Sequence, residues 1–92
     1  MARTKPTKSA APVPTVGSVL GSWVRATRTQ LGMSQRQLAD AASLSRSYVC
    51  DIERGRGLEP SLATLDALAR SLDLTLTAFI AEVDEQSRAG TP

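Results

Sequence analysis

Two short amphipathic segments separated by a tight turn occupy the middle of the chain, at residues 34–55, SQRQLADAASLSRSYVCDIERG. Helical periodicity predicts a first helix over residues 35–42 and a second over residues 46–54. Ser34 and Ser45 stand immediately before them, and serine is a favoured cap because its hydroxyl accepts a bond from a free backbone N–H.

Three further helical segments flank this pair. The first is expected over residues 18–31, where Leu20, Val24 and Leu31 share one face. The fourth follows Ser61, and its apolar stripe consists of Leu62, Leu65, Leu68, Ala69 and Leu72. A fifth follows Thr75, with apolar residues at Leu76, Phe79, Ile80 and Val83. Residues 74–77 also alternate as a strand would, but the spacing of three and four continues to Val83 and favours a helix. The expected fold is therefore all-α, with five helices.

The chain has 92 residues, which allows one domain at most. Residues 1–17 include three prolines and few large apolar side chains, so we expect a flexible basic arm there. Residues 18–85 are expected to form the folded domain, and residues 86–92 a short tail.

Charge is distributed unevenly along the chain, although the net charge is only +2. Residues 1–57 hold nine basic and three acidic side chains, a net charge of +6, and residues 58–92 hold two and six, a net charge of −4. A basic end facing phosphates and an acidic end facing away would give this distribution.

The residue types present exclude several kinds of site. The chain has no histidine and one cysteine, so a zinc site of Cys and His ligands, a histidine general base and an internal disulfide are all excluded. No Gly-rich phosphate loop or evident carboxylate pair is present either, so we expect no cofactor and no enzymatic activity. No run of 18 apolar residues and no apolar leader segment is found, which predicts no contact with membranes and a cytoplasmic, nucleoid-associated protein.

The central pair of helices has the apolar pattern of a helix-turn-helix unit. If Gln35 is position one, positions four, eight, ten, fifteen and eighteen are Leu38, Ala42, Leu44, Val49 and Ile52, and position five is the small Ala39. This resembles the Cro and phage-repressor type of helix-turn-helix regulator. The resemblance covers about two thirds of the chain, from Leu20 to Ile80, and includes "SRSYV", "IERG" and "PSLATLDALARSLDL". It implies a compact, lambda-repressor-like DNA-binding domain, with the second and third helices as the helix-turn-helix.

The sequence departs from the pattern of that family at three positions. Position nine is usually glycine because the turn needs a positive φ, and here it is Ser43. A residue with a side chain costs about 1 kcal/mol in that conformation, so the turn is expected to be strained or to adopt a variant geometry. Trp23 and Thr27 are also unusual for the first helix, where we expect Trp23 to be a packing or interface residue.

Side chains on the outward face of the second short helix are the candidates for contact with DNA, because the start of that helix meets base edges in a docked unit. The expected base-reading residues are Arg46, Ser47, Cys50 and Asp51. Arg46 suits guanine, and Asp51 suits cytosine N4 or orients Arg46 or Arg54. The expected phosphate-binding residues are Gln35, Arg36, Tyr48, Arg54 and Arg56.

Two residues outside this set have structural interpretations. By the family resemblance, Arg28 pairs with Glu53 and ties the first helix to the end of the recognition helix. Cys50 is interpreted as a small space-filling residue, in preference to a redox switch.

One short recognition helix reads few base pairs, so a homodimer on paired half-sites is expected. The fifth helix supplies the expected interface, at Leu76, Phe79, Ile80 and Val83. The leading hypothesis is a sequence-specific transcriptional regulator that binds double-stranded DNA, similar to the controller proteins of restriction–modification systems. An antitoxin-type autorepressor that binds a toxin, and an interaction module that has lost tight DNA binding, remain as alternatives. RNA polymerase is a further candidate partner.

Overall fold

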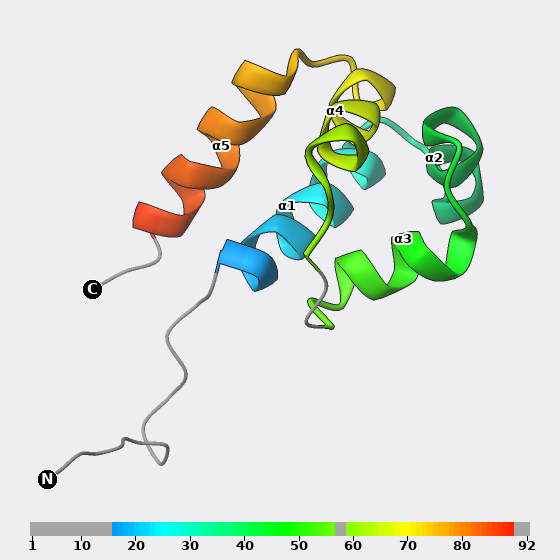
Figure 1. Cartoon of the computed structure of the whole chain (residues 1–92), viewed down its shortest axis with the longest axis horizontal. Coiled ribbons are helices and arrows are strands. Elements are labelled where there is room, and N and C mark those ends of the chain that lie inside the picture. The colour runs from blue at the N-terminus through cyan, green and yellow to red at the C-terminus, as the bar shows by residue number, and fades with distance from the viewer. Residues whose placement is uncertain (1–15, 57–58, 90–92) are drawn as a thin grey trace, which may run out of the picture.

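The computed structural model describes residues 16–56 and 59–89, and within these ranges the chain forms five α-helices and no strand. The helices are α1 (Val16–Gln30), α2 (Gln35–Ala42), α3 (Arg46–Glu53), α4 (Leu62–Ser71) and α5 (Leu76–Ala89) (Figure 1). The all-α, five-helix prediction is therefore confirmed. The expected basic arm lies outside the described residues, except for Val16 and Gly17, which belong to α1.

Both ends of the folded region differ from the expected boundaries. The first helix begins at Val16, two residues early, and ends at Gln30 rather than Leu31. Gly32 explains that end: its φ of +72° turns the chain, and Met33 N–H donates back to the Arg28 carbonyl at 3.0 Å. At the other end, residues 86–89 are helical and not a tail.

The strand alternative at residues 74–77 is wrong, because α5 begins within it at Leu76. Thr75 caps this helix as expected: its hydroxyl accepts a bond from Ala78 N–H at 3.1 Å. That bond satisfies one of the backbone donors left unpaired at every helix start, so the helix has a defined beginning.

The core is a single cluster contributed by all five helices. Its buried members are Leu20, Val24, Leu38, Ala39, Ala42, Val49, Ile52, Leu68, Ala69, Leu72, Phe79 and Val83. Two leucines expected on apolar faces are exposed instead, Leu31 by 49% and Leu62 by 68%. Leu31 follows the last residue of α1, and Leu62 is the first residue of α4, so neither has a full turn of helix around it.

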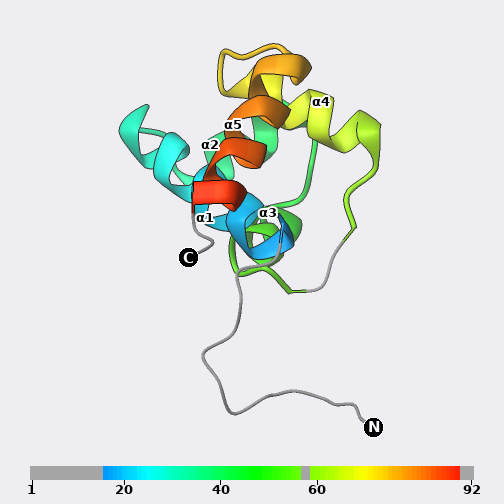
Figure 2. The ribbon, with the colours of Figure 1, turned by 90° about the vertical axis from the view of Figure 1, so that its left-hand side faces the viewer.

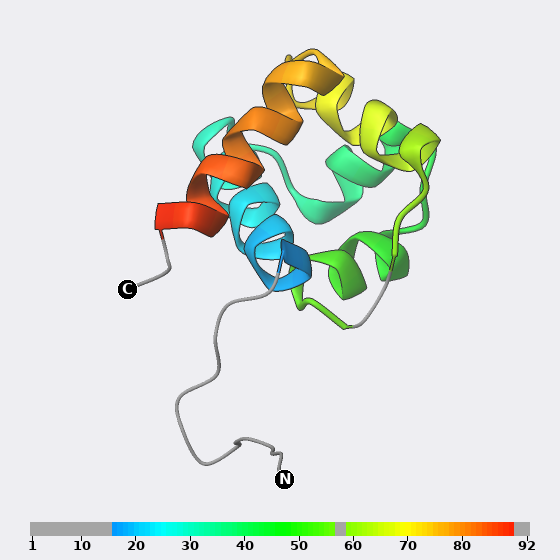
Figure 3. The same ribbon diagram turned by 60° about the vertical axis from the view of Figure 1, so that its left-hand side comes forward.

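The helices pack in a ring of contacts, α1 on α3 and α5, α2 on α3 and α4, and α4 on α5. As a result α3 and α5 lie on opposite sides of the molecule, which is clear when Figure 1 is compared with the turned views of Figures 2 and 3. Trp23 of α1 meets Phe79 of α5 edge to face, with ring centroids 5.0 Å apart. Phe79 is fully buried, and burial of such a side chain stabilises the fold by about 1.5–3 kcal/mol. Trp23 is thus a packing residue, as expected.

Among the described residues, none of the helices has both the length and the apolar character that crossing a bilayer requires.

Candidate nucleic-acid interface

The start of α2 is fixed by a reciprocal pair of hydrogen bonds. The Ser34 hydroxyl accepts from Gln37 N–H at 3.0 Å, and the Gln37 side-chain oxygen accepts from Ser34 N–H at 2.7 Å. This capping box leaves other N–H groups of the first turn without intrahelical partners. Their partial positive charge makes this end of α2 a favourable place for an anion. The same end lies beside α3, because Gln35 contacts Glu53.

The turn between α2 and α3 has the conformation that the pattern requires, although it lacks glycine. Ser43 has φ +58° and ψ +42°, which is the left-handed helical region. Its N–H donates to the Asp40 carbonyl, and Leu44 N–H donates to the Ala39 carbonyl at 2.8 Å. The turn is therefore well hydrogen-bonded, and it is Ser43 that bears the conformational cost of about 1 kcal/mol.

The two faces of α3 divide as the sequence predicts. Val49 and Ile52 are buried against the core. On the outward side, Arg46 and Ser47 are exposed, and Cys50 and Asp51 are half-exposed. The Ser45 hydroxyl caps the helix by accepting from Tyr48 N–H at 3.1 Å. Four side chains expected to read bases therefore lie along the accessible part of one short helix.

The residues expected to bind phosphates surround that face but are not equally available. Arg36, Arg54 and Arg56 are exposed, and Tyr48 is half-buried with its ring against the core. Gln35 is half-buried as well, and its amide Nε2 donates to Glu53 Oε1 at 3.1 Å. Sequence reasoning missed this bond: nothing in the spacing of Gln35 and Glu53 indicates that their side chains meet.

The bond from Gln35 is part of a buried ionic cluster centred on Glu53, whose side chain is only 3% exposed. Arg28 donates to this carboxylate twice, from Nε at 2.6 Å and from Nη2 at 3.1 Å. Its Nη1 also donates to the Met33 carbonyl at 2.7 Å. The expected pairing of Arg28 with Glu53 is confirmed. The cluster joins α1, the loop before α2, α2 itself and the end of α3, so it ties the two helices of the helix-turn-helix pattern to one another and to α1.

Glu53 also stabilises the charged form of its partner. The hydrogen bond to this carboxylate raises the pKa of Arg28 above its ordinary value, although partial burial opposes the shift. Arg28 is charged, as arginine is throughout the range in which proteins are studied, and its partner stabilises that charge. The pair contributes no net charge to the surface near α3, where the exposed arginines then dominate.

Asp51 has a different partner from the two considered in the sequence. Its Oδ1 lies 3.8 Å from Nε of Arg56, a residue beyond the end of α3, and the structure pairs it with neither Arg46 nor Arg54. The signal was present in the sequence, since Gly55 predicts a chain reversal that returns the next residue to the helix.

Two of the four residues expected at a dimer interface are unavailable for it. Phe79 is 0% and Val83 is 5% exposed, because both face the core of their own chain. Leu76 is half-buried, and only Ile80, at 41% exposed, presents a large apolar surface. The apolar spacing on α5 reflects burial against α1 and α4 within one protomer.

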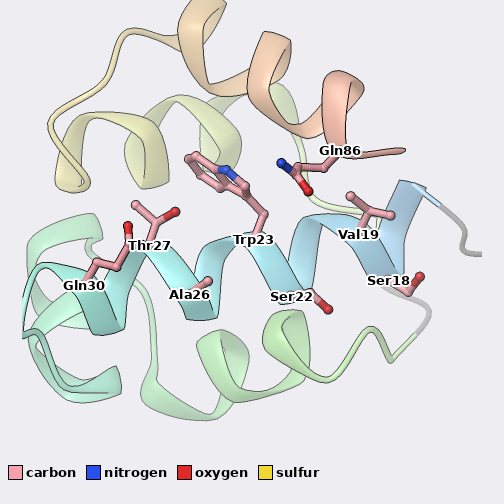
Figure 4. Close-up of a pocket in the computed structure, with 8 residues that line it drawn as sticks. All are labelled: Ser18, Val19, Ser22, Trp23, Ala26, Thr27, Gln30 and Gln86. Atoms are coloured by element: carbon pink, nitrogen blue, oxygen red, sulfur yellow. The ribbon is translucent and has the colours of Figure 1, made fainter. Parts of the chain in front are cut away.

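A hollow of about 490 Å³ lies along α1 beside the C-terminal half of α5 (Figure 4). Its lining is formed by Ser18, Val19, Ser22, Trp23, Ala26, Thr27, Gln30 and Gln86. These include no ionisable side chain, so the hollow brings together no acid–base pair. Thr27 and Trp23, the unusual residues of α1, both lie here.

Comparison with known proteins gives consistent results. The sequence matches the helix-turn-helix family over residues 24–79. It is 44% identical over 63 residues to the immunity repressor protein of Bacillus phage phi105, covering 68% of this chain and 43% of the repressor. Among solved structures, the restriction–modification controller protein C.AhdI from Aeromonas hydrophila has 37% identity and a TM-score of 0.63, covering 67% of this chain and 92% of the controller. The clp gene regulator ClgR from Corynebacterium glutamicum has 28% identity and a TM-score of 0.75, covering 85% and 82%. Because the chain spans less than half of the phage repressor, the comparison with that protein extends only to this part of it.

Proposed function

This chain belongs to the helix-turn-helix family, and from that premise we propose that it is a sequence-specific, DNA-binding transcriptional regulator whose recognition helix is α3. The observation that carries the proposal is the position of Arg46 and Ser47, which are exposed at the N-terminal end of a helix whose opposite face is buried. An α-helix with this accessible end fits the major groove.

In this proposal Arg46 reads guanine, because its guanidinium donates two parallel bonds to O6 and N7, and Ser47 and Cys50 follow it along the groove. The backbone phosphates are held by Gln35, at the positive end of α2, and by Arg36, Arg54 and the Tyr48 hydroxyl. The Glu53 cluster supports this arrangement, because it fixes Gln35 and α3 relative to one another.

We propose that the protein binds a palindromic operator as a homodimer, since a helix of eight residues reads only a few base pairs. The proposed interface is centred on Ile80. Ile80 lines an apolar hollow of about 360 Å³, together with Val16, Thr77, Ala81, Val83 and Asp84. Exposed Val16, at 64%, adds to this surface from α1. The location on α5 keeps the interface away from α3.

The kind of regulator is a finer proposal. The 37% identity to a restriction–modification controller supports a regulator of that type. We propose that it works in the cytoplasm on the nucleoid, because its proposed ligand is double-stranded DNA. The identity to a phage immunity repressor supports the broader class equally well, since both are regulatory proteins. Contact with RNA polymerase would follow if the protein activates transcription, and footprinting with the polymerase present tests it.

Selection of bound fragments from random duplexes tests the function. A palindromic preferred site is expected, with an affinity that falls steeply as salt rises, because each neutralised phosphate releases counterions. Arg46→Ala is expected to weaken discrimination between that site and other sequences while the helical content stays unchanged. Selection of no preferred duplex by the wild-type protein would overturn the proposal. If Arg46→Ala discriminates between the preferred site and other sequences as strongly as the wild-type protein does, Arg46 does not read a base.

A further inference from the structure

The turn that ends α3 brings Arg56 back beside Asp51. Gly55 has φ +64°, Gly55 N–H donates to the Ile52 carbonyl at 3.0 Å, and Arg56 N–H donates to the Asp51 carbonyl at 3.1 Å. This pair of backbone bonds is a Schellman turn. The turn returns the backbone of Arg56 to the level of Asp51, and in the structure Nε of Arg56 lies 3.8 Å from Oδ1 of Asp51.

Asp51 lies on the part of α3 that faces solvent. It follows Ser47 by four residues, about one helical turn and roughly 6 Å along the axis, and its side chain is 43% exposed. A carboxylate in this place is repelled by the phosphates of a docked duplex. That cost is offset only if a positive group compensates the charge and a base donates a hydrogen bond to it.

The chemistry of the major groove restricts which base can do so. An ionised carboxylate only accepts hydrogen bonds. Guanine and thymine present acceptors in the groove, whereas cytosine N4 and adenine N6 are donors. Adenine also presents its N7 acceptor beside N6, so one carboxylate oxygen would face a lone pair. Cytosine presents a C–H group there, and it is the base that a carboxylate favours.

We propose that Asp51 and Arg56 act as one unit that selects cytosine at a single position of each operator half-site. Asp51 accepts from cytosine N4 through one oxygen. Arg56 is a positioning residue that holds the other oxygen and compensates its charge, a role different from the phosphate contact expected from the sequence. This inference rests on the proposed function and deepens it, since it assigns both a base and a partner to one reading residue.

The test is a binding series in which each position of the selected operator carries all four bases in turn. Asp51→Asn is expected to move the preference at one position from cytosine to adenine, by about tenfold, because a carboxamide accepts from N6 and donates to N7. Asp51→Ala is expected to abolish the preference at that position alone. Asp66→Asn removes the same charge from an exposed ion pair on α4 and is the matched control, with no change in base preference.

Arg56→Gln tests the positioning role. It is expected to reduce the cytosine preference at that same position in the wild-type background and to have no further effect on it when Asp51→Asn is present. If Arg56 contacts only a phosphate, the variant instead lowers affinity equally for all four bases and reduces the salt dependence by about one phosphate in both backgrounds. That result would overturn the proposal that Asp51 and Arg56 act as one unit. Arg70→Gln, from the exposed pair with Asp66 on α4, is the control for loss of positive charge.

The outcomes separate this inference from the proposed function. If the wild-type chain selects no site, the proposed function fails and the inference falls with it. If the chain selects a site and every base preference survives both Asp51 substitutions, only the inference is wrong. Circular dichroism of each variant checks that the helices are intact, which is expected because the side chains are 58% exposed at Arg56 and 43% exposed at Asp51.

Discussion

Gly21 in α1 lies directly against the carbonyl oxygen of Ile52 in α3, so closely that a β-carbon at Gly21 would overlap it and would come within 2.8 Å of the Glu53 carbonyl oxygen. A glycine inside a helix normally costs about 0.5–1 kcal/mol relative to alanine. Here it allows the backbone of α1 to approach the end of the recognition helix. The position of α3 thus depends on the absence of a side chain in its neighbour.

Gly21→Ala is therefore expected to destabilise the fold by about 1–3 kcal/mol, the usual cost of overpacking, because carbonyl oxygens of the backbone cannot rotate away. Urea unfolding measures it. Helix propensity alone predicts the opposite sign, a gain of about 1 kcal/mol. The reverse exchange at an exposed position of the same helix, Ala26→Gly, provides the propensity reference. A stabilised Gly21→Ala variant would contradict the close approach of α1 and α3.

Arg28→Met is expected to cost about 3–5 kcal/mol, because it leaves Glu53 charged and buried with only the Gln35 amide as a side-chain donor. The double variant Arg28→Met, Glu53→Met should recover much of the loss, since no unpaired charge remains. Chemical denaturation of the three proteins gives the comparison.

Arg70→Met is the control for the preceding experiment, because it breaks an exposed pair with Asp66 and should change stability by less than about 1 kcal/mol. A similarly small effect of Arg28→Met would mean that Glu53 is not buried in solution.

Ser43→Gly is expected to stabilise the protein by a few tenths to about 1 kcal/mol. Glycine adopts the φ of +58° without steric cost, and its greater freedom in the unfolded chain takes back part of the gain. Thermal unfolding measures the change. Ser45→Ala, two residues later, should instead destabilise by about 1 kcal/mol because it removes the cap of α3. Loss of stability in Ser43→Gly would contradict the left-handed turn.

Ile80→Glu is expected to dissociate the proposed dimer and leave each protomer folded, because Ile80 is 41% exposed. Sedimentation velocity reports the mass, and circular dichroism reports the fold. Its neighbour Phe79 provides the contrast: Phe79→Ala should cost about 3–5 kcal/mol of folding stability, as expected for a buried aromatic. A dimer that survives Ile80→Glu would place the interface elsewhere.

Local sequence patterns were sufficient to predict the helices and the outward face of α3. Serine caps, the spacing of Leu38, Val49 and Ile52, and the stops at Gly32 and Gly55 act over a few residues, so their effects are visible in the chain itself. Of the two geometries left open for the turn, Ser43 has the positive φ that the family pattern requires. These features predicted an accessible helix starting at Arg46, and the family resemblance predicted the pairing of Arg28 with Glu53.

Tertiary structure decided which apolar side chains are buried within the protomer and which polar side chains meet there. Periodicity gave α5 an apolar face, but it could not show that Phe79 and Val83 face α1 and α4 while Ile80 faces solvent, because that depends on the angles at which helices cross. The contact of Gln35 with Glu53 joins residues 18 positions apart, and the approach of Gly21 to Ile52 joins two helices distant in the chain. The sequence determined which helices form and which side of α3 is polar, since both follow from neighbouring residues. Only the packed structure determined how rigidly that polar side is held, because the burial of Glu53 requires three helices at once.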